Sequence, residues 1–132
     1  MRRFVQSAFL LMAVLFGAAE AAAQQSLTFV VRNETNAVVN YKLWSATRNH
    51  VWPSSSSAYV MNFKGDQRST RINCIPGEKI CYGAWFRQNP NIIWGAGTTG
   101  KGRCADCCYT CNGTATKVKV LTYVPRQSGT GR

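Results

Sequence analysis

Four of the six cysteines lie within eight residues of the chain, between positions 104 and 111. They are Cys104, Cys107, Cys108 and Cys111, and the remaining two, Cys74 and Cys81, lie seven residues apart upstream. In a chain of 132 residues, such a cluster either cross-links the fold through disulfides or holds a metal ion through thiolates. The interpretation of the rest of the chain depends on which alternative holds.

The spacing within the cluster is compatible with both alternatives. Cys104 and Cys107 have C-x-x-C spacing, as do Cys108 and Cys111, and four thiolates suffice for tetrahedral zinc. Zinc sites usually take their two pairs from separated segments, whereas these pairs abut. Six cysteines also form an even set, which permits 15 disulfide pairings. We therefore predict disulfides with no metal and no cofactor, and keep a zinc-bound structural module as an alternative; a redox-active C-x-x-C ranks lower.

A predicted turn between Cys74 and Cys81 reduces the number of possible disulfide pairings. Pro76 and Gly77 favour a type II turn, because proline presets φ and glycine supplies a positive φ. If the turn closes a tight hairpin, Cys74 and Cys81 are diagonal neighbours about 7–8 Å apart, which is too far for a disulfide. Each then bonds to the cluster, and the remaining two cluster cysteines pair with each other. If the turn is wider, Cys74 bonds to Cys81 and the cluster pairs internally.

The N-terminus has the pattern of a secretory signal peptide. Arg2 and Arg3 precede a largely apolar run over residues 4–19, and small residues at 21–23 suit cleavage after Ala23. The apolar core is shorter than the roughly 20 residues that span a bilayer, and no second long apolar run follows. We predict a secreted or periplasmic protein with one domain over residues 24–125, a disordered tail over 126–132 and no transmembrane segment after cleavage.

Beyond the signal segment the hydrophobic pattern predicts an all-β fold. No window shows the apolar spacing of an amphipathic helix, whereas alternation at every second residue recurs. Strands are predicted over residues 26–32, 38–44, 58–63, 69–74, 79–87, 92–95 and 117–124. The first two are expected to form a hairpin, and in the last Val118 and Val120 are expected to face the core while Lys117 and Lys119 face water. The prediction is a small antiparallel β-sandwich or barrel, stapled by disulfides.

The charge balance favours anionic partners. Without residues 1–23 the chain holds 14 Lys and Arg against four Asp and Glu, a net charge of +10. A scattered basic surface suits an anionic glycan, a lipid surface or an acidic protein. Nucleic acid would use the same ingredients, but export makes it a less natural partner.

Aromatic residues beside these charges supply the binding hypothesis. Trp52 falls in the loop predicted over residues 45–57, and Trp44 falls on the polar side of its strand. Exposed tryptophan beside Arg or Lys suits stacking on sugars, insertion at a lipid interface or a protein contact. The predicted binding surface consists of Arg48, His50, Trp52 and the serines 54–57, extended by Trp94 and Lys101.

Catalytic groups are few. His50 is the one histidine, and the four carboxylates after residue 23 are Glu34, Asp66, Glu78 and Asp106. Three of these carboxylates fall in predicted turns and Asp106 falls in the cysteine loop, so solvated roles are expected. No catalytic residue is assigned, and we predict that the protein is not an enzyme. The alternative is a small secreted hydrolase or toxin that uses His50 with a nearby carboxylate.

Several motifs resemble those of a group of small exported bacterial proteins of unassigned function. They are the run from Pro76 to Trp85, the Trp94-Gly95-Ala96-Gly97 segment, the C-x-x-C-C-x-x-C cluster and the Arg48-Asn49-x-x-Trp52-Pro53 segment. The resemblance covers most of the chain after residue 23. It implies a bacterial, exported, disulfide-bonded domain and brings no activity with it. The resulting hypothesis is an exported binding module for an anionic envelope component, glycan or protein partner.

Overall fold

The computed structural model describes residues 24–125 as an all-β fold. The predicted signal segment and C-terminal tail lie outside the described residues. The strands are β1 (Gln25–Asn33), β2 (Val39–Ser45), β3 (Val51–Trp52), β4 (Tyr59–Met61), β5 (Asp66–Cys74), β6 (Lys79–Phe86), β7 (Asn89–Gly95), β8 (Cys108–Thr110) and β9 (Lys119–Leu121). Within this part of the chain there is no helix, and hence no helical segment that could cross a membrane.

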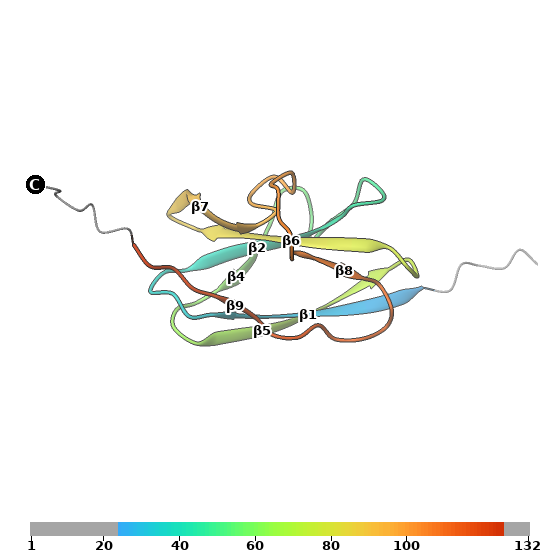
Figure 1. The fold of residues 1–132 in the computed structure, drawn as a ribbon, viewed down its shortest axis with the longest axis horizontal. Coiled ribbons are helices and arrows are strands. Elements are labelled where there is room, and N and C mark those ends of the chain that lie inside the picture. Colours follow the sequence, from blue (N-terminus) through green and yellow to red (C-terminus); the bar gives the residue numbers. More distant parts are fainter. Residues whose placement is uncertain (1–23, 126–132) are drawn as a thin grey trace, which may run out of the picture.

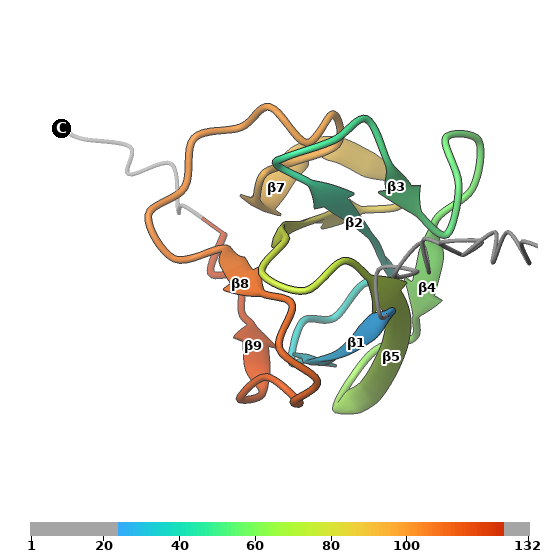
Figure 2. The same ribbon diagram turned by 90° about the vertical axis from the view of Figure 1, so that its right-hand side faces the viewer.

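The strands form two layers that face each other (Figure 1). The first sheet has the order β5-β1-β9, and the second has the order β3-β2-β6-β7 with β4 also on β2 and β8 also on β6. The predicted all-β sandwich or barrel is thereby confirmed as a sandwich, and its disulfides are described below. One pair departs from the antiparallel expectation, since β9 runs parallel to β1. After β8 the chain descends from the second sheet and passes alongside β1 in the same direction (Figure 2), bridged at Thr28 and Ala115.

The hairpin predicted from residues 26–32 and 38–44 is wrong, because β1 and β2 lie in different sheets. A buried amide redirects the chain between them. The Asn33 side chain is fully buried, and its Nδ2 donates hydrogen bonds to Ala37 O at 2.8 Å and Asn62 O at 2.9 Å. Its Oδ1 accepts hydrogen bonds from Thr35 N at 3.0 Å and Thr35 Oγ1 at 2.6 Å. These hydrogen bonds satisfy the polar atoms of the buried amide. They hold a connection that leads from one sheet to the other, where a hairpin was predicted.

Both sheets contribute their predicted apolar faces to one core. The innermost side chains of β1 and β2 are Leu27, Phe29, Val31, Val39, Tyr41 and Leu43, each at most 2% exposed. The Phe29 ring lies 6.0 Å from the Tyr41 ring and 5.3 Å from the Tyr82 ring, centroid to centroid. Alternation along each strand therefore assigned the buried face correctly here.

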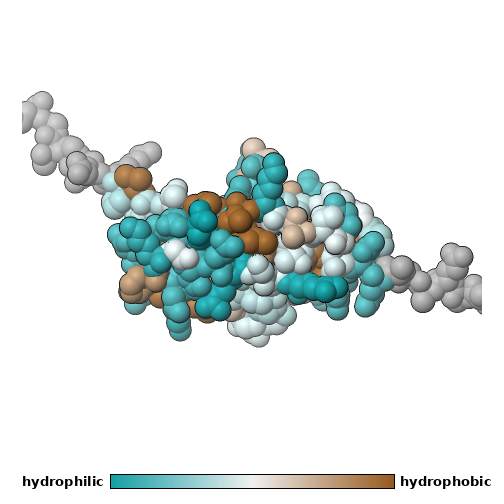
Figure 3. All heavy atoms as spheres, turned by 90° about the horizontal axis from the view of Figure 1, so that it is seen from below, coloured by the Kyte–Doolittle hydropathy of each residue, from teal (hydrophilic) through white to brown (hydrophobic). Residues whose placement is uncertain are grey.

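The last strand presents the opposite face to the one predicted. Val118 and Val120 are each 41% exposed, whereas Leu121 is buried. Lys119 lies beside Val31 in the register, so its side chain turns inward at the edge of the sandwich, with Nζ 5.7 Å from the centroid of the Tyr82 ring. Figure 3 looks onto the outer face of the three-stranded sheet, where hydrophobic residues gather amid hydrophilic ones.

Three disulfides link the described cysteines: Cys74–Cys111, Cys81–Cys108 and Cys104–Cys107. This is the first of the two predicted pairing schemes, although its premise of a hairpin is wrong, because β5 and β6 lie in opposite sheets. The predicted turn does form, with Gly77 at φ 79° and Glu78 N bonded to Ile75 O at 2.9 Å. It carries the chain from one sheet to the other, and the disulfides then anchor the segment after residue 95 to both.

Candidate functional site

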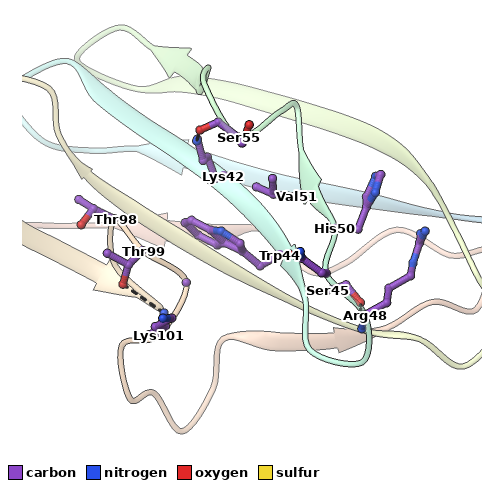
Figure 4. A pocket seen from close by; sticks show the side chains of 12 residues that line it. Lys42, Trp44, Ser45, Arg48, His50, Val51, Ser55, Thr98, Thr99 and Lys101 are labelled. Carbon is purple, nitrogen blue, oxygen red and sulfur yellow. Dashed lines mark hydrogen bonds between the residues drawn. The ribbon is translucent and has the colours of Figure 1, made fainter.

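A pocket of about 440 Å³ opens on the outer face of the six-stranded sheet (Figure 4). It lies between the segment that follows β2 and the glycine-rich loop that follows β7. Its lining consists of Lys42, Trp44, Ser45, Arg48, Asn49, His50, Val51, Ser55, Thr98, Thr99, Gly100 and Lys101. A volume of this size is typical of small-molecule sites.

Trp44 forms one wall of the pocket and is held by glycines. A Cβ atom on Gly83 would lie 2.7 Å from the indole and 2.1 Å from Gly97 O. A Cβ atom on Gly100, where φ is 75°, would lie 2.6 Å from the indole. The absence of side chains at these positions lets the loop lie directly on the sheet and on the tryptophan. The half-buried indole is thus fixed in place while part of it lines the hollow.

Three cationic residues belong to the lining of the pocket: Lys42, Arg48 and Lys101. Figure 4 shows that the Arg48 side chain extends away from Trp44 at the edge of the pocket. No carboxylate of residues 24–125 belongs to the lining. Lys42 Nζ donates one hydrogen bond to Ser55 O at 2.9 Å, which leaves two of its three donor positions. The arrangement presents positive charge to any molecule that enters.

Arg48 is positioned by a buried carboxylate behind the pocket wall. The side chain of Glu78 is 1% exposed and forms an ion pair with the guanidinium of Arg48. It also accepts hydrogen bonds from Ser45 Oγ at 2.6 Å and from Ile75 N at 3.0 Å. Burial by itself raises the pKa of Glu78, but the hydrogen bonds from Arg48, Ser45 and Ile75 outweigh it and hold this pKa at about 2.

The prediction that Glu78 is a solvated turn residue is therefore wrong. The Pro-Gly turn places its carboxylate back over Ile75 N, three residues earlier. The approach of Arg48, 30 residues away in the sequence, depends on the pairing of β2 with β6. No local pattern in the sequence indicates that contact.

The structure divides the predicted binding residues. Arg48, His50 and Lys101 line the pocket, as does Ser55 of the serine run. Lys42 and Trp44 also line the pocket, although neither is among the predicted binding residues. For Trp44 a signal was present, namely a large aromatic residue on the polar side of its strand.

Trp52 and Trp94 do not line this pocket. Trp52 lies in β3, where its pairing with Leu43 turns the indole inward to 9% exposure, so the expected open loop is wrong at this position. It supports the site from below: the His50 ring packs edge-on at 4.5 Å and the Arg48 guanidinium lies 5.6 Å from the ring centroid. Trp94 packs against Phe86 and donates a hydrogen bond from Nε1 to Thr122 O at 3.0 Å.

The two alternatives, zinc ligation and catalysis by His50, depend on the state of the cysteines and on the surroundings of His50. The sulfur atoms of Cys81, Cys107 and Cys108 lie within 4.8 Å of one another, but all six cysteines are in disulfides. Thiolate ligation of a metal would require their reduction. His50 forms no ion pair with a carboxylate of residues 24–125, and Glu78 is paired with Arg48.

Fold and site together define a small disulfide-bonded β-sandwich with a cationic, tryptophan-walled pocket. Comparison of the chain with protein-family models, curated proteins and solved structures found no match.

Proposed function

We propose that the protein is an exported binding module, stabilised by disulfides, whose pocket takes an anionic ligand. The observation that carries the proposal is that Lys42 and Lys101, with Arg48 at the edge, line one hollow that has no acidic lining residue among residues 24–125. Clefts lined by one sign of charge concentrate ligands of the opposite sign. The net charge of +10 over residues 24–132 acts in the same direction.

Export is supported by two features of the chain. Six cysteines joined in three disulfides are typical of proteins that fold in oxidising compartments. The pattern of residues 1–23 is that of a cleaved signal peptide, and the resemblance to small exported bacterial proteins agrees with it. Intact mass of protein recovered from an exporting bacterial host tests this part. Loss of residues 1–23 and of six hydrogens is the expected result, and a retained N-terminus would contradict export.

The pocket is tested by salt-dependent binding. The oxidised protein should be retained on immobilised heparin, used as a generic polyanion, and released as ionic strength rises. The double variant Lys42→Gln/Lys101→Gln should elute at lower salt, since it removes two pocket charges on exposed or half-buried side chains.

A control variant separates the pocket from general surface charge. Arg71 is exposed on β5 of the other sheet, so Arg71→Gln should elute close to the parent protein. The double variant Arg71→Gln/Arg87→Gln loses two charges, as the pocket variant does, and is therefore its matched control. Equal shifts for the two double variants would show that the pocket has no special role and would refute the proposal.

A further inference from the structure

We infer that the ligand of this pocket is an acidic oligosaccharide, one that carries carboxylate or sulfate groups on a pyranose ring. The inference rests on the proposed function and narrows it to one ligand class. It combines three features of the lining: a fixed indole, separated lysines and free hydroxyl and amide groups.

The uncovered part of the Trp44 indole suits the apolar C–H groups of a sugar. Gly83 and Gly100 pack against the indole, and Gly100 lies over its Cγ, Cδ2 and Cε2 atoms. The ring is therefore held rigidly before any ligand arrives, which lowers the entropy lost on binding, and its remaining surface faces the pocket. Its partial burial places it inside the hollow, whereas residues that insert into a lipid surface protrude from the protein. A pocket wall of this kind fits a ring that enters the hollow better than a membrane that remains outside it.

The charges are distributed in a way that suits separate acidic groups. Glu78 bonds Nε and one terminal nitrogen of Arg48, so the side-on fork of this guanidinium is already occupied. Lys42 and Lys101 therefore bind most of the anionic groups of the ligand, and each acts as a point charge. Lys42 belongs to β2 and Lys101 to the glycine-rich loop, so two anionic positions can be met from two sides of the pocket.

Two polar side chains in the lining have hydrogen-bonding capacity that a sugar can use. The side chains of Thr98 and Asn49 line the pocket and take part in none of the side-chain hydrogen bonds found in residues 24–125. A hydroxyl and an amide offer both donors and acceptors, as sugar hydroxyl groups require. A purely anionic ligand such as an acidic peptide side chain would need donors alone.

The test titrates the oxidised protein with several probes and follows tryptophan fluorescence and heat. The probes are oligogalacturonate for carboxylated sugar, heparin-derived oligosaccharide for sulfated sugar, maltohexaose as the neutral control, phosphatidylglycerol vesicles and polyglutamate. At least one acidic sugar should bind and change the tryptophan emission, while maltohexaose should not. Lys101→Gln should weaken that binding about fivefold, the scale of one exposed ion pair.

Two variants report on the sugar itself. Trp44→Phe should abolish the fluorescence response and weaken binding of the acidic sugar about tenfold, on the scale of an aromatic contact. Thr98→Val changes an exposed side chain and leaves the core intact, so it serves if Trp44→Phe folds poorly. It should weaken the acidic sugar about threefold to tenfold through loss of a hydrogen bond and leave polyglutamate unaffected.

The outcomes separate the two proposals. If vesicles or polyglutamate bind with dependence on Lys42 and Lys101 while neither acidic sugar does, the sugar inference is overturned and the proposed anionic site stands. If none of the four anionic probes binds, both are overturned. If maltohexaose binds as tightly as the acidic sugars, the pocket binds sugars without regard to their charge. The inferred requirement for acidic groups is then wrong.

Discussion

Replacement of Glu78 by glutamine removes the charge that organises the wall of the pocket. Glutamine has nearly the same shape as glutamate, but its amide group presents donors where the carboxylate accepts from Arg48, Ser45 and Ile75. The side chain at this position is 1% exposed, so water cannot replace the lost partners. We expect Glu78→Gln to lower the free energy of unfolding substantially at neutral pH.

The magnitude follows from the pKa of Glu78. A decrease from 4.5 to about 2 corresponds to an upper bound of about 3.4 kcal/mol, at about 1.36 kcal/mol per pKa unit. Arg48 is 38% exposed, which screens part of this energy, so the expected loss at pH 7 is about 2–3 kcal/mol. Because the folded pKa lies below the unfolded one, this stabilisation is fully present above pH 4.5. It disappears as the pH falls towards 2.

Urea unfolding of the oxidised parent and variant at pH 7, 4, 3 and 2 measures the effect. The difference between the two proteins should shrink with falling pH and be small at pH 2. Glu34→Gln is a matched control, because the ion pair of Glu34 with Arg32 lies at the surface with side chains 33% and 39% exposed. It should change stability by less than about 1 kcal/mol. A Glu78→Gln effect that stays constant from pH 7 to pH 2 would refute the electrostatic reasoning.

Two further predictions concern the frame of the fold. Asn33→Ala should cost about 3 kcal/mol in urea unfolding, because it leaves the buried partners of the amide unsatisfied; Asn36→Ala, at an exposed position of the same corner, should be nearly neutral, and equal effects would contradict the role of Asn33. Among the disulfides, Cys74→Ala/Cys111→Ala opens a loop with a sequence separation of 37 and Cys104→Ala/Cys107→Ala one of 3. Loop entropy predicts losses of about 4 and about 2 kcal/mol, respectively. Thermal unfolding of the two variants ranks them, and a reversed order would show that loop entropy does not control their contributions.

The period-two alternation of apolar residues determined the fold class and most of the buried faces. Leu27, Phe29 and Val31 had to share one side of a strand, because successive side chains point to opposite faces. The Pro76-Gly77 turn was equally local, since proline and glycine set its backbone angles. The even number of cysteines and their crowding over residues 104–111 indicated disulfides, but left open whether Cys74 and Cys81 bond to the cluster or to each other.

Which strands pair, and in which sheet, was decided by the tertiary structure. Alternation identifies a face and says nothing about a partner, so β1 and β2 could equally have formed a hairpin. The buried amide of Asn33 sends them to opposite layers instead. The same limit applies to β9, whose parallel register beside β1 reversed the predicted faces of Val118 and Lys119.

The candidate site, too, was decided by the tertiary structure. Lys42, Arg48 and Lys101 come from a strand and two loops, and the pairing of β2 with β6 and the path of the glycine-rich loop bring them together. The sequence alone determined that basic and aromatic residues would be available on a rigid β scaffold. Their placement around one pocket, and the burial of Glu78 behind it, required long-range contacts, because neither arises from interactions between neighbours in the chain.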